Sequence, residues 1–179
     1  MELKNINEIA KKAHIAEKYV EPYGKHKAKI DLSILDELKN NLMLFFTGIT
    51  RDSGTILGEQ KKNVGDKTKQ LDNLVLAVDE AYEALQKGDV DHWGDMLDKT
   101  WQTKKQLASK IANPEIDKMY EDAIKAGAKG GKILGAGGGG FLLLYVPDNK
   151  KASVRKALKG YKEVEFDFAS SGSQIIFMD

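Results

Sequence analysis

The sequence predicts an α+β fold: a ferredoxin-like plait, with helices packed on one face of an antiparallel sheet, plus an additional helical segment. A continuous apolar run, Leu42–Phe46, precedes a long stretch in which apolar residues recur every three or four positions. After residue 130 the pattern changes to short apolar runs with one further helical segment between them. The resulting order of strand, helices, strand, strand, helix and strand is that of the plait.

The first predicted elements are a helix and a buried strand. Apolar residues among charges indicate a helix over residues 7–20, and Pro22 and Gly24 end it. The run Leu42–Phe46 contains no polar residue, which is typical of a strand buried on both faces.

Two long helices are predicted next. An apolar stripe runs from Leu71 to Leu85, and Gly88 is a natural helix stop. A second stripe covers residues 90–111, where the polar Lys104 interrupts it.

A third helix and the remaining strands complete the fold. Asn113 is expected to cap the helix and Pro114 to occupy its first position, with Gly127 as the stop. The elements expected after it are strands over 132–134 and 141–146, a helix over 148–158, and strands over 164–168 and 174–177.

A glycine cluster between two predicted strands is the main candidate site. Five of the six residues from 135 to 140 are glycine; the six are Gly135, Ala136, Gly137, Gly138, Gly139 and Gly140. Such a loop offers backbone N–H groups without side chains in the way, which suits phosphate. The alternative is a tight hairpin in which backbone packs against backbone. The cluster is not a Walker A loop, because no Gly-Lys-Ser/Thr follows it.

Composition excludes several classes of protein. The 28 basic and 27 acidic residues give a net charge of +1, so neither nucleic acid nor an acidic membrane is expected as a partner. There is no cysteine, and the three histidines lack the spacing of a zinc site, so no metal site is predicted. No apolar run has the roughly 20 residues of a membrane span. The polar start predicts a cytoplasmic protein.

Three motifs carry a resemblance to a known family. Lys132–Phe141 resembles the third conserved motif of the GHMP kinases, and Phe45–Ser53 with the following residues 56–63 resembles a strand, T-G-x-x-R motif and helix of that family's sugar-phosphate kinase branch. Residues 111–116 and 126–132 resemble the lead into its glycine loop. The similarity covers residues 30–179, and it is nearest to the D-glycero-D-manno-heptose phosphate kinases.

The resemblance implies a role for the chain. A GHMP kinase C-terminal domain would span residues 30–179 and would place its glycine loop beside ATP, Mg²⁺ and a sugar phosphate. Arg51 would clamp the phosphate of the sugar, because a guanidinium binds phosphate oxygens in pairs, although an ordinary surface arginine is the alternative. Thr47 and Ser53 would supply hydroxyl contacts, although helix capping by Ser53 or Thr50 is the alternative.

The same resemblance implies that the chain is incomplete. The sequence contains no Gly-Ser-Ser for the family's P-x-G-x-G-S-S loop, which lies in its N-terminal domain. Residues 1–29 would be an N-terminal helix and turn left over from that domain, and Lys27 would stand where the family has its catalytic aspartate. We therefore expect no kinase activity from this chain alone, and no catalytic residue is assigned.

Three hypotheses follow. The chain is the C-terminal domain of an ATP-dependent sugar (heptose) phosphate kinase, a non-catalytic module that binds sugar phosphate, or a self-associating module. Its expected partners are ATP and sugar phosphate, a separate N-terminal domain, or a second copy of itself.

Overall fold

The computed structural model describes residues 5–13, 15–22, 28–30, 33–50 and 53–169. Its elements, in chain order, are α1 (Ile6–Lys12), the 3-10 helix η1 (Glu17–Tyr19), β1 (Val20–Pro22), β2 (Ala28–Ile30), α2 (Ser33–Asn40), β3 (Leu42–Phe46), α3 (Ser53–Asn63), α4 (Thr68–Gln86), α5 (Val90–Lys105), α6 (Pro114–Lys125), β4 (Gly130–Ile133), β5 (Phe141–Tyr145), η2 (Asp148–Lys150), α7 (Lys151–Ala157) and β6 (Lys162–Glu163).

The main sheet has four antiparallel strands in the order β4-β5-β3-β6. In the register of β3 with β5, Leu42 lies opposite Tyr145 and Phe46 opposite Phe141. The strands therefore follow one another along the chain as β3, helices, β4, β5, α7 and β6, which is the order of the ferredoxin-like plait. The predicted fold class and the buried strand at residues 42–46 are confirmed.

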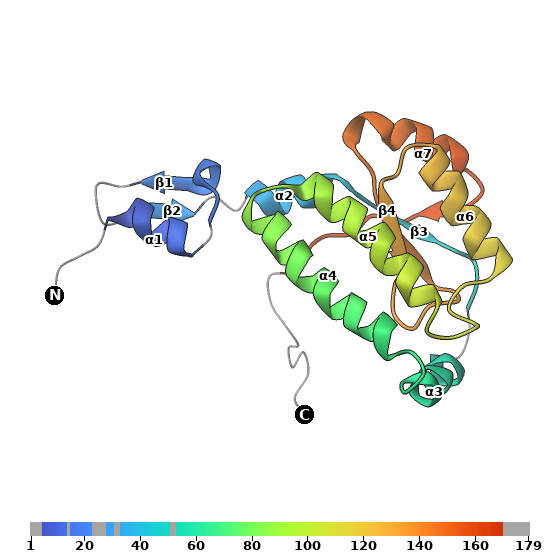
Figure 1. Ribbon diagram of the computed structural model, residues 1–179. Coiled ribbons are helices and arrows are strands. Elements are labelled where there is room, and N and C mark those ends of the chain that lie inside the picture. The colour runs from blue at the N-terminus through green and yellow to red at the C-terminus, as the bar shows by residue number, and fades with distance from the viewer. Residues whose placement is uncertain (1–4, 14, 23–27, 31–32, 51–52, 170–179) are drawn as a thin grey trace, which may run out of the picture.

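One face of the sheet carries the largest core. Alternate residues of the two central strands, among them Phe45 and Leu142, form this core with buried residues of α6 and α7. Figure 1 shows where α6 and α7 lie relative to the strands. Asn113 caps α6, since its side-chain oxygen accepts a hydrogen bond from Ile116 N at 2.9 Å, and Pro114 occupies the first helical position. The predicted start of this helix is confirmed.

Helix α5 lies along β4, at one edge of the sheet (Figure 1). An added Cβ on Gly130 would stand 2.2 Å from Gly94 O and 2.6 Å from Asp98 N, so the helix and strand backbones touch. The first half of α5 also reaches the opposite face of the sheet, where Trp93 meets Tyr145 edge to face at 6.4 Å. Helices thus pack on one face of the sheet and also along its edge.

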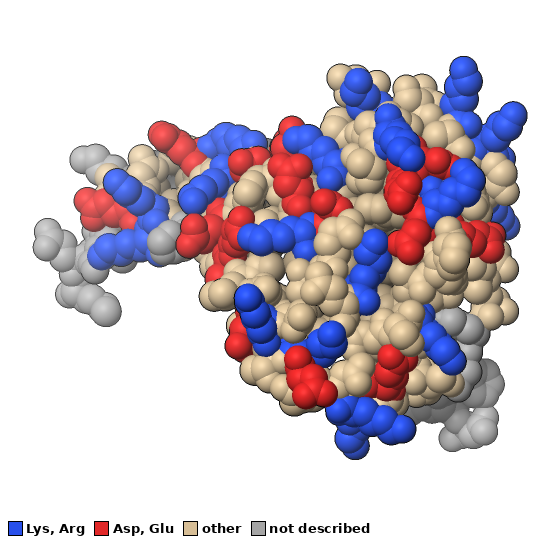
Figure 2. Space-filling view, turned by 45° about the vertical axis from the view of Figure 1, so that its right-hand side comes forward, with Lys and Arg blue, Asp and Glu red and all other residues tan. Residues whose placement is uncertain are grey.

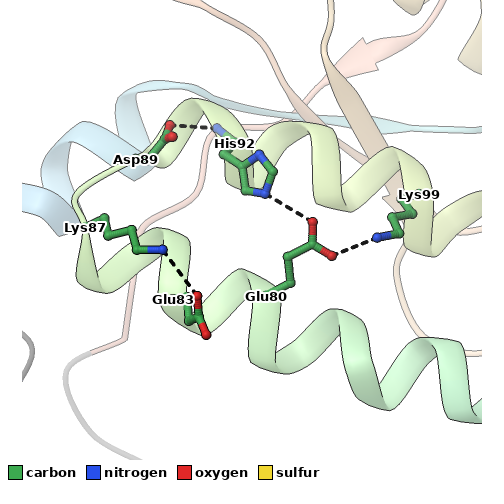
Figure 3. Close-up of polar contacts among 6 residues, drawn as sticks. All are labelled: Glu80, Glu83, Lys87, Asp89, His92 and Lys99. Atoms are coloured by element: carbon green, nitrogen blue, oxygen red, sulfur yellow. Dashed lines mark hydrogen bonds and ion pairs between the residues drawn. The ribbon is translucent and has the colours of Figure 1, made fainter.

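Polar contacts join α4 to α5 (Figure 3). The Glu80 carboxylate lies 2.7 Å from Lys99 Nζ and 3.3 Å from His92 Nε2, and Asp89 caps α5 by accepting from His92 N at 3.0 Å. The hydrogen bond from Lys99 lowers the pKa of Glu80 below its ordinary value. Both contacts of Glu80 are exposed to solvent, so each adds little to stability.

The N-terminal segment differs from the single helix expected over residues 7–20. Helix α1 ends at Lys12, and the chain continues through η1 into β1, which pairs with β2. Tyr19 is buried, and its hydroxyl donates to Glu37 on α2 at 3.2 Å. This tertiary contact holds residues 17–19 out of the α1 axis. The unit formed by α1, β1 and β2 lies to one side of the sheet domain (Figure 1).

Two further predictions about elements need correction. The helix expected to reach residue 111 ends at Lys105, because Leu107 and Ile111 turn into the core instead. The strand expected over 164–168 is shorter and earlier, at Lys162–Glu163. Val164 N still donates to Leu44 O at 2.8 Å, and Phe166 packs against the apolar cluster that contains Leu42 and Tyr145. The strand expected over 174–177 lies outside the described residues.

The surface shows no charge segregation on the face in Figure 2, where acidic and basic side chains are interspersed. Among the described residues, none of the helices combines the length and apolar character that crossing a bilayer requires.

The contact between α5 and β4 gives a stability prediction. We expect Gly130→Ala to lower the free energy of unfolding by about 1–3 kcal/mol, because its Cβ would push the helix backbone away from the strand. The matched control is Gly58→Ala in α3, where an added Cβ meets nothing within 4 Å and should stabilise the helix by about 0.5–1 kcal/mol. Urea unfolding of both variants measures this, and equal stability of the two would contradict the packing described.

Candidate functional site

The glycine loop, residues 135–140, connects the edge strand β4 to β5. It is fixed to two other connections of the fold. Gly138 N donates to Ile111 O at 2.5 Å, and Gly140 N donates to Ile49 O at 2.8 Å. Asn113 adds a hydrogen bond from its side-chain nitrogen to Gly138 O at 3.3 Å. The loop is therefore held between the segment that follows β3 and the segment that precedes α6.

Close packing explains two of the glycines. A Cβ on Gly137 would stand 2.8 Å from Ile111 O, and a Cβ on Gly139 would stand 2.6 Å from Ile49 O. Both residues are buried. At these positions the alternative interpretation of the cluster, backbone packed against backbone, accounts for glycine without a ligand.

Unused donors remain in the loop after this packing. Within the described part of the chain, no acceptor lies opposite the N–H groups of Ala136, Gly137 or Gly139. The loop also lines an open cavity of about 320 Å³, with Phe46, Ile49, Thr50, Ser53, Leu134, Ala136, Gly137, Gly139, Gly140 and Phe141 around it. Backbone donors beside a cavity with two hydroxyl side chains can bind a phosphate group.

The structure places the three predicted substrate residues differently. Ser53 lies at the cavity, at the start of α3, and is exposed. Thr47 is buried beneath the loop: its Oγ1 donates to Gly140 O at 2.9 Å and accepts from Ile49 N at 3.2 Å. The Thr47 hydroxyl thus stabilises the loop from below. Arg51, and likewise Lys27, lies outside the described residues, so the roles suggested for both stay predictions.

Lys104, at the end of α5, contacts the glycine loop, although the sequence analysis assigned it no role. Its Nζ donates to Gly135 O at 2.6 Å. Burial lowers the pKa of this ammonium, and the positive charge of Lys132 on β4 lowers it further. The one signal in the sequence was that Lys104 interrupts an otherwise apolar helix stripe.

A protein-bound metal has no evident ligand set here. Within the described ranges, no group of three or more His, Asp or Glu side chains could hold a metal ion. Among the described residues we therefore assign no side chain as a ligand of Mg²⁺.

Comparison with known proteins places this site in a family. Residues 81–163, which include the glycine loop, match the model of the GHMP kinase C-terminal family. The chain belongs to the GHMP kinases through this C-terminal domain. It is 35% identical over 145 residues to the D-glycero-alpha-D-manno-heptose 7-phosphate kinase of Campylobacter jejuni, in an alignment that covers 78% of this chain and 42% of that kinase.

A solved kinase shares the fold. The L. major mevalonate kinase, solved in complex with R-mevalonate, superimposes with a TM-score of 0.60 at 25% identity, over 66% of this chain and 37% of that one. The GHMP domain thus spans less than half the length of either relative.

The front of the chain matches a second family. Residues 1–95 match the formate–tetrahydrofolate ligase model, so this half of the chain belongs to that family as well. The ligase of Thermosipho africanus is 46% identical over 59 residues, which cover 33% of this chain and 11% of that ligase. Residues 1–29, which we interpreted as a remnant of a GHMP N-terminal domain, lie within this match and thus have a second explanation.

The contacts of Thr47 give a prediction about the loop. We expect Thr47→Val to lower the free energy of unfolding by about 1–3 kcal/mol, because it leaves the partly buried N–H of Ile49 without its acceptor. The amide of Ile49 should then exchange with solvent faster, as measured by NMR. Thr47→Ser is the control: it keeps the hydroxyl and should keep this amide protected. Fast exchange in both variants would contradict the role given to the hydroxyl.

Proposed function

We propose that this chain contributes the glycine loop to the phosphoryl-transfer site of an ATP-dependent sugar phosphate kinase, with a heptose phosphate as the substrate. The observation that carries the proposal is the set of N–H groups at Ala136, Gly137 and Gly139, which have no acceptor among the described residues and lie beside an open cavity. The similarity to the Campylobacter jejuni heptose 7-phosphate kinase supports the choice of substrate.

The chain acts with further groups that it does not itself supply. Phosphoryl transfer requires charge stabilisation around the moving phosphoryl, usually by Mg²⁺ and several fixed donors. The sequence has no Gly-Ser-Ser for the family's ATP-phosphate loop, and the described residues offer no metal cluster. The chain also spans only 42% of the heptose kinase's length. We therefore propose that it binds phosphate ligands but does not catalyse transfer alone.

The match to formate–tetrahydrofolate ligase supports no activity of its own. The aligned residues cover only 11% of the length of the Thermosipho africanus ligase. We propose that this half of the chain provides structure: Tyr19 and Lys18 contact α2 and the turn before α5 through bonds to Glu37 and Gly88 O.

Ligand protection tests the proposal. We expect Mg-ATP or heptose 7-phosphate to raise the melting temperature of the chain, since a ligand at 100 times its Kd stabilises by about 2.7 kcal/mol. Ala136→Leu should remove this protection, because the larger side chain fills the cavity beside the loop. Ala152→Leu, on the exposed side of α7, is the control and should leave it intact.

Two outcomes would contradict the proposal. Absence of protection in the unmodified chain at millimolar ligand would mean that the loop binds no phosphate ligand. Heptose-phosphate-dependent release of ADP by the chain alone, lost in Arg51→Ala, would mean that the chain is catalytically sufficient.

Self-association is a second candidate, supported by α4. Four of its large apolar side chains, Val75, Leu76, Val78 and Tyr82, are 61–66% exposed. Two of them, Val78 and Tyr82, line a hollow of about 310 Å³ between α4 and α5. Exposed apolar patches of this kind are typical of protein interfaces, and we propose a second copy of the chain as the occupant because the same helix can pack against itself about a two-fold axis.

Sedimentation velocity tests this second candidate. We expect the unmodified chain to form dimers at micromolar concentration and Val78→Glu to be monomeric, since it places a charge at the centre of the patch. Val64→Glu, which lies before α4 and is also exposed, is the control and should remain dimeric. A monomeric unmodified chain would exclude the dimer.

A further inference from the structure

Two lysines converge beside the first residue of the glycine loop. Lys104 extends from the last turn of α5, and its Nζ lies 2.6 Å from Gly135 O. Lys132 lies on β4, on the same side of the strand as Gly130, which touches the α5 backbone. Gly130 lies against Gly94 and Asp98 of α5, and further along the chain Gly135 lies against Lys104. The helix and the strand therefore run in the same direction. This arrangement brings the side chains of Lys104 and Lys132 together.

Among the described residues, no acidic side chain pairs with either lysine. Neither ammonium has a carboxylate partner within the part of the chain that the structure describes, and neither is among the residues with further contacts. The neighbouring Lys105 differs, since its Nζ is paired with Asp117 at 3.0 Å. Burial and the charge of Lys132 both lower the pKa of Lys104, as expected when no anion balances two nearby cations.

The pair faces space that a ligand can enter. An added Cβ on Gly135 would meet nothing within 4 Å, and this residue is exposed. Lys104 uses one of its three N–H donors on Gly135 O, so two remain for another acceptor. Both lysines are half-buried, which strengthens their attraction to an anion relative to fully solvated side chains.

We propose that Lys104 and Lys132 form a binding site for the phosphate group of a phosphorylated ligand, at the end of the glycine loop where Gly135 lies. A phosphate monoester carries up to two negative charges and three acceptor oxygens, which match two ammonium groups with free donors. The inference rests on the proposed function, because that function supplies two such ligands, the sugar phosphate and ATP. The site adds to the loop the positive charge that its neutral N–H groups lack.

Calorimetric titration with inorganic phosphate, heptose 7-phosphate and Mg-ATP tests the site. We expect Lys104→Met and Lys132→Met each to raise the Kd for inorganic phosphate, and for one of the two larger ligands, about tenfold to a hundredfold. Each variant loses one charge-assisted contact to the phosphate, and a change of this size corresponds to that loss. Lys105→Met is the matched control: it removes the same charge from the adjacent residue and should leave all three affinities unchanged. Lys132→Met also separates loss of charge from loss of the bond between Lys104 and Gly135.

The larger ligand whose affinity falls identifies the source of the phosphate. If only the affinity for heptose 7-phosphate falls, the site binds the phosphate of the sugar. If only the affinity for Mg-ATP falls, the site binds a phosphate of the nucleotide. If all three variants bind the ligands with the same affinity as the unmodified chain, the lysine site is overturned and the proposed function stands. Absence of inorganic phosphate binding would also overturn the site, whereas failure to bind both larger ligands would overturn the proposed function.

Discussion

Close approach of backbone to backbone at glycine positions determines how this domain is assembled. At Gly130 it lets α5 touch β4, and at Gly137 and Gly139 it lets the loop pack onto the carbonyls of Ile111 and Ile49. A side chain at any of these positions would separate elements that are in van der Waals contact. The position of α5 relative to the sheet edge, and with it the position of Lys104 beside the loop, depends on these contacts.

The packing also changes how the glycine motif is interpreted. A glycine cluster suggests a phosphate loop, yet Gly137 and Gly139 are required by the fold whether or not a ligand binds. Buried Thr47 likewise holds the loop from beneath. The functional argument therefore rests on what this packing leaves unused among the described residues, namely three backbone donors beside an open cavity and, next to Gly135, two lysines without a carboxylate partner. Groups that the fold has not already satisfied are the ones available to a ligand.

The chain joins segments of two families in one fold. The heptose kinase alignment covers 78% of the chain, so it must extend into residues 1–95, which the ligase model also matches. The overlap includes β3, the strand that pairs with β5 at the centre of the sheet. Such a strand needs little more than a continuous apolar sequence, and that requirement is common to buried strands in unrelated folds. Residues 17–19, ahead of α2, contact Glu37 on α2 through Tyr19 and Gly88 O through Lys18.

Local sequence by itself determined much of the secondary structure and the fold class. The apolar run at 42–46, the Asn113-Pro114 start of α6 and the glycine-bounded hairpin each follow from the chemistry of neighbouring residues, and their order along the chain indicates the plait. The sequence also indicated the glycine loop as the site. Periodicity was wrong where side chains make distant contacts: the first helix ends at Lys12, ahead of a segment in which Tyr19 bonds to Glu37, and Phe166 packs on an apolar cluster after β6 has ended.

Only the tertiary structure decided the composition of the site. It separated the buried hydroxyl of Thr47 from the exposed Ser53, and it brought Lys104 to Gly135 across 31 positions of sequence. No local pattern contains this information, because the distance between two such side chains is set by how α5 packs on β4 and not by the residues adjacent to either.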